Sequence, residues 1–283
     1  RNVHICGDLE YLPNALRLFD WNEYPSSSLP FTFCPHKIFA LKMPQSNISL
    51  DKLLTSLQSK TLKYMDFRSC EYITKLPDLS VSAPNLKELV LSDCNNLVDV
   101  HQSVGRLDKL VYLEMGETSI SVLPPSFGNL TRLKTILFGS FDHLLHLPSS
   151  IYELHNLSDL GLYGTVIFPK DFRFRYIFPS LIKLTLSFFE IRSEVDFILT
   201  SCCTRTLKYL CIYNSNVVTL PEKNVDFTRL HSLHIEGCKL LQRTPRFPKS
   251  ITKRRHTNGV RLYDLKCDHL WFYGEPHSEN SDT

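Results

Sequence analysis

The sequence predicts an α/β solenoid in which a parallel β-sheet lines a concave face and irregular or short helical segments form the convex face. Three observations predict this fold. An apolar pattern recurs about every 24 residues along the chain, each recurrence contains alternating apolar positions, and many recurrences carry a Leu-Pro pair in their second half. We number each repeat from its first apolar residue, so that Leu86, Leu89, Leu91 and Cys94 stand at positions 1, 4, 6 and 9 of one repeat.

The repeat spacing is regular over most of the chain. First positions are Ile38, Leu62, Leu86, Leu110, Leu133, Leu157, Leu181, Leu207 and Leu230. They are separated by 24, 24, 24, 23, 24, 24, 26 and 23 residues. Units of this length with this leucine pattern identify an array of leucine-rich repeats.

Three regions follow from the repeat boundaries. Residues 1–37 are predicted to be an N-terminal entry segment with a degenerate repeat, whose buried residues we expect to be Leu16, Leu18 and Trp21. Residues 38–250 are predicted to form the array of about nine units. Residues 251–283 are predicted to be a partly disordered tail.

The first half of each repeat is predicted to form a strand, and the second half an outer turn or short helix. Alternating apolar residues form a short strand with one inward face, and a single strand cannot bury that face alone, so neighbouring units stack. Proline lacks an N–H and fixes φ, so the Leu-Pro pairs at 76–77, 123–124, 147–148 and 220–221 predict outer turns. Three units then place a serine four residues before a leucine, which predicts short helical or 3₁₀ turns at 103–107, 126–130 and 150–154.

Composition and charge exclude several classes of function. The chain is 43% hydrophobic and 22% charged, which is typical of a globular protein. A net charge of +3 is too mild to predict nucleic-acid binding. No run of about 18 apolar residues predicts a membrane span. Nine scattered cysteines favour a reducing compartment.

Three cysteines occupy the same repeat position. Cys70, Cys94 and Cys238 all stand at position 9, where the chain turns inward after the strand. A metal site needs ligands close together, and whole repeats separate these residues without any CxxC pair. We therefore predict that they are buried spacers that pair with backbone groups, and not ligands or nucleophiles.

No catalytic motif is present in the sequence. It contains neither a GxxxxGK[ST] phosphate loop nor GxGxxG, and neither GxSxG nor HExxH. We predict that the chain is not an enzyme and holds no cofactor and no metal.

The sequence supports protein binding better than catalysis. Residues between the buried positions of each strand face the concave side, where a partner could contact them. The predicted partner-binding residues are Tyr64, Asp66, Arg68, Glu88, Tyr112, Glu114, Asp159, Tyr163, Lys183, Phe188, Tyr209, Tyr213, His234 and Glu236, with Val90 and Ser92 beside Glu88. Aromatic residues mixed with charge are common in interface hot spots. The four tyrosines Tyr112, Tyr163, Tyr209 and Tyr213 are therefore predicted to contact a partner; alternatively, the row only keeps the sheet soluble.

The stretch LPNALRLFDWNEYPSSSLPFTF, residues 12–33, carries a family resemblance. Together with LKYMDFRSC and LPDLSVSAPNLKELVLSDCNNLV within 62–98, it resembles the repeat region of plant intracellular nucleotide-binding immune receptors of the Toll/interleukin-receptor type. The resemblance implies a cytoplasmic or nucleo-cytoplasmic repeat domain. It also implies two protein partners: a pathogen effector or host protein, and the receptor's own nucleotide-binding domain. ADP or ATP is expected only in that domain, and no small-molecule substrate is expected.

Two alternatives remain open from the sequence. The first is an extracellular receptor ectodomain, in which the sequons at Asn47, Asn129 and Asn156 would carry glycans. The second is the substrate-recognition array of an F-box ubiquitin ligase. The first would need a Gly-x-Ile-Pro element, which the sequence lacks, and the second would need an F-box ahead of the array.

Overall fold

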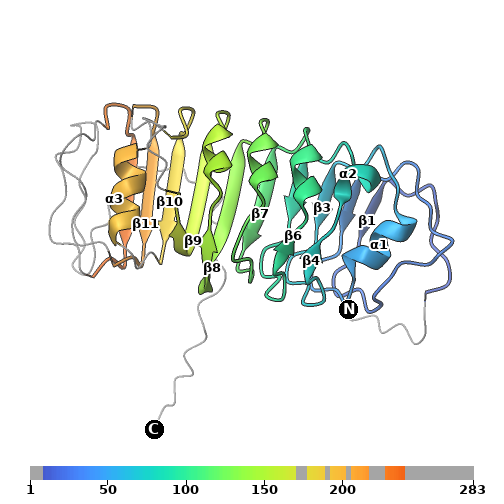
Figure 1. Cartoon of the computed structure of the whole chain (residues 1–283). Helices are drawn as coiled ribbons and strands as arrows, with labels where there is room; N and C mark the ends of the chain where they lie inside the picture. Colours follow the sequence, from blue (N-terminus) through green and yellow to red (C-terminus); the bar gives the residue numbers. More distant parts are fainter. Residues whose placement is uncertain (1–8, 170–176, 189–191, 202–204, 217–226, 240–283) are drawn as a thin grey trace, which may run out of the picture.

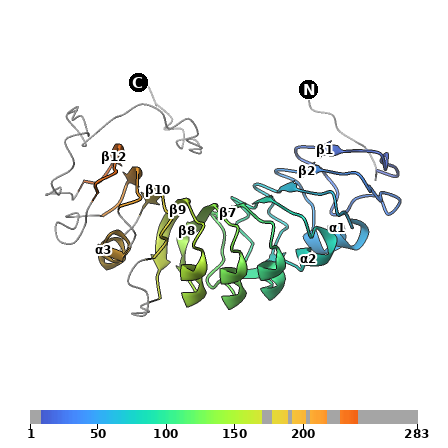
Figure 2. The same cartoon turned by 90° about the horizontal axis from the view of Figure 1, so that it is seen from above.

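The computed structural model describes residues 9–169, 177–188, 192–201, 205–216 and 227–239. The predicted tail at 251–283 and the Leu-Pro pair at 220–221 lie outside these residues. The described chain winds as an arc-shaped solenoid, with the strands along the inner face and the helices on the outer side (Figures 1 and 2). The predicted fold class is confirmed.

A ten-stranded parallel sheet lines the inner face. In spatial order its strands are β1 (Leu18–Asp20), β2 (Ala40–Lys42), β3 (Tyr64–Asp66), β5 (Glu88–Val90), β7 (Tyr112–Gly116), β8 (Thr135–His146), β9 (Asp159–Ile167), β10 (Lys183–Ser187), β11 (Tyr209–Tyr213) and β12 (Ser232–Glu236). A second, two-stranded parallel sheet pairs β4 (Lys75–Leu76) with β6 (Asp99–Val100). Spatial order follows chain order, because each repeat contributes one inner strand and stacks on the preceding repeat.

The outer side carries short helices. These are α1 (Leu50–Ser56), α2 (Leu79–Ser82), α3 (Arg192–Ser201) and the 3₁₀ helices η1 (Gln102–Arg106), η2 (Pro125–Asn129) and η3 (Ser149–Glu153). The three predicted helical turns at 103–107, 126–130 and 150–154 are thus confirmed as 3₁₀ helices.

Adjacent 3₁₀ helices stack closely. The hydroxyl of Ser126 donates to the carbonyl of Gln102 at 2.6 Å, and Ser150 repeats this bond to Pro125 at 2.6 Å. A side chain at Gly105 would meet the carbonyl oxygen of Ser126, so glycine permits the close approach there.

Positions 1, 4 and 6 of the repeats form the core. Leu86, Leu89 and Leu91 are 0% exposed, and the corresponding residues of the neighbouring units are buried with them. Strand register keeps these positions aligned, because Met65, Leu89 and Leu113 pair directly across β3, β5 and β7. The core is therefore a continuous ladder through the solenoid.

The expected register of the degenerate repeat was wrong at one residue. Phe19 and not Leu18 pairs with Leu41 of β2, and Phe19 is 5% exposed whereas Leu18 is 51% exposed. Phe19 stands three residues after Leu16 and two before Trp21, which is the spacing of positions 1, 4 and 6. Strand alternation therefore turns Leu18 to the concave side.

Position 8 of most repeats bends the backbone into the left-handed region. Gln45, Ser69, Asp93 and Glu117 there have φ between 53° and 59°. Each N–H donates to a carbonyl of the next unit, as from Ser69 to Ser92 at 2.8 Å and from Asp93 to Gly116 at 2.9 Å. The bend turns the chain out of the sheet while it keeps the units hydrogen-bonded.

We expect Leu89→Asp to destabilise the array by about 4 kcal/mol or more, because it buries an unpaired carboxylate within the ladder. Circular dichroism melting and gel filtration measure the loss. The neighbouring exposed substitution Glu88→Gln is the control and is expected to leave the melting temperature unchanged. A soluble Leu89→Asp protein with an unchanged melting temperature would contradict the register.

Candidate functional site

The concave face is an ordered grid, because parallel register aligns equivalent residues of adjacent strands. The first row contains Leu18, Ala40, Tyr64, Glu88, Tyr112, Thr135, Asp159, Lys183, Tyr209 and Ser232. The second row contains Asp20, Lys42, Asp66, Val90, Glu114, Leu137, Gly161, Thr185, Cys211 and His234. The third row runs from β7 to β12 through Gly116, Gly139, Tyr163, Ser187, Tyr213 and Glu236.

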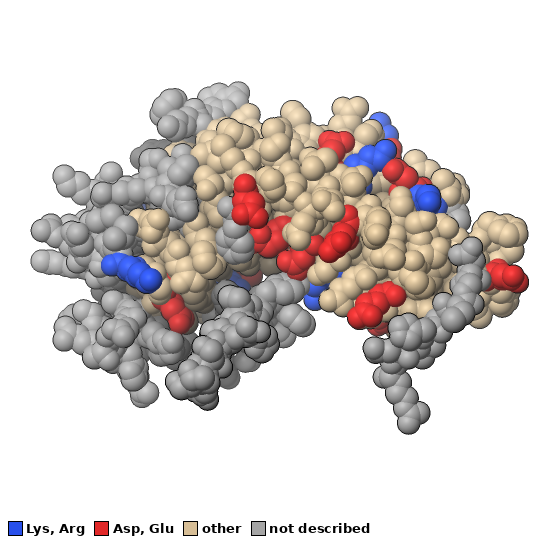
Figure 3. Space-filling view, turned by 90° about the horizontal axis from the view of Figure 1, so that it is seen from below, with Lys and Arg blue, Asp and Glu red and all other residues tan. Residues whose placement is uncertain are grey.

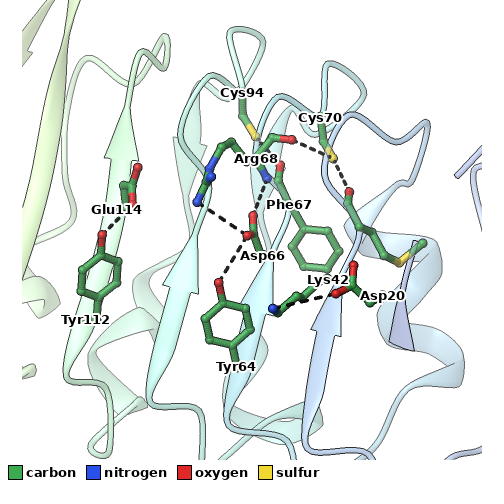
Figure 4. A network of polar contacts seen from close by, with 11 residues as sticks. Asp20, Lys42, Tyr64, Asp66, Phe67, Arg68, Cys70, Cys94, Tyr112 and Glu114 are labelled. Atoms are coloured by element: carbon green, nitrogen blue, oxygen red, sulfur yellow. Dashed lines mark hydrogen bonds and ion pairs between the residues drawn. The ribbon is translucent and has the colours of Figure 1, made fainter. Parts of the chain in front are cut away.

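The N-terminal third of the grid is a closed network of charges (Figure 4). Lys42 Nζ lies 3.9 Å from the Asp20 carboxylate and 5.4 Å from the centre of the Tyr64 ring. The Tyr64 hydroxyl donates to Asp66 at 3.3 Å, and Arg68 lies 3.6 Å from the same carboxylate. Burial and the Asp66 charge raise the pKa of Tyr64 to about 12. The cations and carboxylates of this region satisfy one another.

The middle of the grid combines tyrosines with carboxylates. The Tyr112 hydroxyl donates to Glu114 at 2.6 Å, and burial followed by this bond raises the pKa of Tyr112 well above its usual value. Burial raises the pKa of Tyr163 to about 12, with further contributions from Glu114, Asp159 and Glu117. Glu88 stands beside Tyr112 in the first row and is exposed.

Three glycines form the floor of this middle region. Gly116, Gly139 and Gly161 lie on the neighbouring strands β7, β8 and β9. A Cβ added at Gly116 would contact the Tyr163 ring at 3.8 Å, and one at Gly161 would lie 3.7 Å from the Tyr163 hydroxyl. Gly139 has φ +119°, and a side chain there would meet the carbonyl oxygen of Tyr163. The Tyr163 ring and the Leu137 side chain, which a Cβ at Gly161 would approach to 2.5 Å, therefore fill the space that the absent side chains leave.

Asp159 borders the same region on β9. Its Oδ2 lies 3.6 Å from Lys183 Nζ, whereas its Oδ1 is buried without a hydrogen-bond partner among the described residues. Burial raises the pKa of Asp159, and Lys183 opposes part of that shift. The structure thus places an incompletely satisfied carboxylate next to the tyrosines.

The C-terminal third differs from the prediction at two residues. Tyr213 is only 6% exposed, because its ring packs against His234 with centroids 4.9 Å apart. Phe188 is 40% exposed but follows β10 at a left-handed bend with φ 58°, so it lies at the strand end and not in a row. His234 and Glu236 are half-buried and lie 3.0 Å apart, and Tyr209 is half-buried.

The structure brings only part of the predicted set together. Tyr163 lies close enough to Tyr112 to raise the pKa of Tyr112, whereas Tyr209 and Tyr213 lie on β11, two strands beyond β9. Asp66, Val90 and Ser92 are buried, so Glu88 is the accessible residue of the Glu88–Ser92 stretch. The half-buried predicted residues are Tyr64, Arg68, Tyr112, Glu114, Asp159, Tyr163, Lys183, Tyr209, His234 and Glu236.

Sequence reasoning missed two features of the face. One is the pair Asp20 and Lys42, since the expected register of the first repeat was wrong there. The other is the floor of glycines, of which Gly116 and Gly139 stand at position 7 of their repeats and Gly161 stands at position 5. Comparing the same position across aligned repeats would have found the pair Asp20 and Lys42 and two of the three glycines, but not Gly161.

The position-9 cysteines pair with the backbone, as predicted. Cys70 Sγ donates to the Met43 carbonyl at 3.1 Å, and Cys94 Sγ donates to the Phe67 carbonyl at 3.2 Å (Figure 4). Cys238 repeats the contact to Ile212 at 3.8 Å. Burial raises the pKa of the Cys70 thiol to about 11 and that of Cys94 to about 12. These thiols bridge one repeat to the preceding repeat.

Within the described residues, no group of three or more His, Cys, Asp or Glu side chains is arranged to hold a metal ion. None of the helices in the described part of the chain is long and apolar enough to cross a membrane.

Comparisons with known proteins agree with the fold. Residues 82–266 match the family model described as "Disease resistance protein RPS4B-like, leucine-rich repeats". The chain is 31% identical to disease resistance protein RPS6 of Arabidopsis thaliana over 272 residues, which is 88% of this chain and 23% of that protein. It is 26% identical to TMV resistance protein N of Nicotiana glutinosa over 84% of this chain and 18% of that protein. The chain therefore spans about a quarter or less of the relatives it matches.

A solved structure shows the same architecture. The plant peptide hormone receptor RGFR1, in complex with RGF2, superposes with a TM-score of 0.53 at 20% identity. The match covers 82% of this chain and 45% of the receptor chain. This likeness supports the solenoid fold.

We expect Cys70 and Cys94 to resist alkylation in the folded protein, because the thiolate is the reactive form and their raised pKa values keep them protonated at pH 8. The exposed Cys34 is the internal control and should react readily. Iodoacetamide labelling followed by peptide mass spectrometry, with and without denaturant, measures this. Alkylation of folded Cys94 as fast as Cys34 would contradict the spacer assignment.

Proposed function

Because this chain belongs to the leucine-rich-repeat family of RPS4B-like plant disease resistance proteins, we propose that it is the protein-recognition and regulatory repeat region of an innate immune receptor. In this role it senses a pathogen effector, or a host protein that an effector has altered, and it restrains the receptor's nucleotide-binding module. Signal transduction then follows when the recognised protein releases that restraint.

One observation carries the recognition part of this proposal. The concave grid presents partly accessible tyrosines and carboxylates on a rigid sheet, with Glu88, Tyr112 and Tyr163 grouped at its middle. Rigid aromatic residues bordered by charge are the side chains that contribute most to protein interfaces. The buried ladder behind them fixes their positions, so little ordering is needed on binding.

The proposal assigns no catalytic step and no cofactor to this chain. ADP or ATP would be held by the nucleotide-binding module, and the receptor would act in the cytoplasm or between cytoplasm and nucleus.

Two of the three sequon asparagines form hydrogen bonds between neighbouring repeats. The side-chain amide of Asn47 donates to the Pro25 carbonyl at 3.1 Å, and that of Asn156 donates to the Thr131 carbonyl at 2.7 Å. Both bonds bridge neighbouring repeats, which explains these asparagines without glycans. The intracellular receptor is therefore preferred over an extracellular ectodomain, and intact-mass measurement after secretion from plant cells tests this preference, because occupied sequons would overturn it.

We expect Tyr163→Ala to leave the array folded and to weaken binding of the recognised protein by about tenfold or more, as for a buried aromatic hot spot. The measurement is proximity labelling from the full-length receptor in leaf cells, with equal melting of the purified repeat region as the folding check. Tyr72→Ala is the matched control, because Tyr72 is 62% exposed in the loop after β3. Identical labelling by all four variants of Tyr112, Tyr163, Tyr209 and Tyr213 would contradict the concave site.

A separate measurement tests the restraint. The purified repeat region and the receptor's nucleotide-binding module, expressed apart, are expected to associate in solution. Absence of association, together with no increase in leaf cell death when the repeats are deleted from the receptor, would refute the regulatory part.

A further inference from the structure

We propose that the middle of the concave face docks a segment of the partner protein that carries Lys or Arg side chains. We name this surface the acidic patch and define it by Glu88, Tyr112, Glu114, Asp159 and Tyr163. The inference rests on the proposed recognition function and specifies the chemistry of the partner.

The argument begins with the distribution of charge over the grid. On β5, β7, β8 and β9 the rows contain the carboxylates of Glu88, Glu114 and Asp159 and contain no Lys or Arg. Asp159 has Lys183 on the next strand, whereas no ion pair among the described residues involves Glu88 or Glu114. Asp and Glu side chains also gather over the middle of the solenoid when it is seen along the strands (Figure 3). This surplus of negative charge is confined to the middle of the concave face, since the whole chain has a net charge of +3.

The same face shows how such a cation would be held. At its N-terminal end Lys42 lies between the Asp20 carboxylate, 3.9 Å away, and the Tyr64 ring, 5.4 Å away. A carboxylate beside a tyrosine ring is thus a cation cradle that the chain fills itself. Glu88 and Glu114 repeat this arrangement beside the Tyr112 ring with two carboxylates, and Arg68, the described cation that lowers the pKa of Tyr112, is already paired with Asp66.

The size of the acidic patch suits an extended segment. The Tyr163 and Leu137 side chains occupy the space beside Gly116 and Gly161, and the Tyr163 ring stays half-exposed on the concave face. The four strands from β5 to β9 span about 15 Å, the length of an extended segment of about four or five residues. Arg or Lys on such a segment would gain both charge attraction and contact with aromatic faces.

The carboxylates around Tyr163 also indicate a negative electrostatic potential at the middle of the concave face. The pKa of its hydroxyl is raised to about 12, firstly by burial and then by Glu114, Asp159 and Glu117. An incoming cation would be attracted by these carboxylates and would also reach the surface faster through electrostatic steering.

The test uses fluorescence anisotropy of a fluorescein-labelled peptide with Arg and Gly alternating over nine residues. We expect it to bind the purified chain at low ionic strength, and we expect Glu88→Gln with Glu114→Gln to weaken binding about tenfold or more. Glu71→Gln with Glu153→Gln removes the same charge from exposed positions outside the rows and should change affinity less than about twofold. A peptide with Glu in place of Arg should not bind.

Three results would overturn the inference. One is absence of Arg peptide binding at low salt, and another is an equal loss of affinity in both double variants, which would indicate unspecific charge attraction. The third concerns residues 243–266, which contain eight Lys or Arg and one Asp. A gain in peptide affinity when Lys253, Arg254 and Arg255 are changed to Gln would show that the chain's own segment, and not a partner, occupies the acidic patch.

Failure of this inference is distinguishable from failure of the proposed function. Loss of partner labelling in Tyr163→Ala without binding of the Arg peptide would keep the recognition role and reject a basic partner. Unchanged labelling in the tyrosine variants would reject both.

Discussion

The inability of a single short strand to bury its own apolar face is the constraint on which the rest of this structure depends. Each repeat places three apolar residues inward over about six residues of chain, and only the neighbouring units can cover them. Parallel stacking follows, and so does the alignment of Leu89 with Met65 and Leu113. The same alignment orders the residues between them into rows on the concave face. Core and recognition surface therefore result from one register.

Polar contacts between repeats maintain that register where the ladder ends. The thiols of Cys70 and Cys94 bond to carbonyls of the preceding repeat, and the left-handed bends at Ser69 and Asp93 bond to the following one. A cysteine is suited to this position because it is small, apolar and a weak donor. Residues that suggest redox or metal chemistry in isolation are structural once their partners are known.

The concave face is divided by how its charges are paired. At the N-terminal end Lys42 and Arg68 neutralise Asp20 and Asp66, so the charges of that region are paired within the chain. In the middle, Glu88 and Glu114 lie beside tyrosines without a cation in the rows. Water screens the half-buried Glu114 less than the exposed Glu88, so the Glu114 charge has the stronger local effect. An interface that must distinguish partners can use such a region for selection by charge.

The sequence by itself determined the solenoid, the ladder and the position-9 cysteines, because the repeat spacing and the apolar alternation depend only on local order along the chain. It also placed most concave residues on the correct face, for the same reason. Only the tertiary structure decided that Phe19 and not Leu18 joins the ladder, and that Tyr213 and Asp66 are covered. It also decided that Gly116, Gly139 and Gly161 meet beneath Tyr163. These outcomes depend on which residues of different repeats become neighbours, and a spacing read within one repeat carries no information about contacts between repeats.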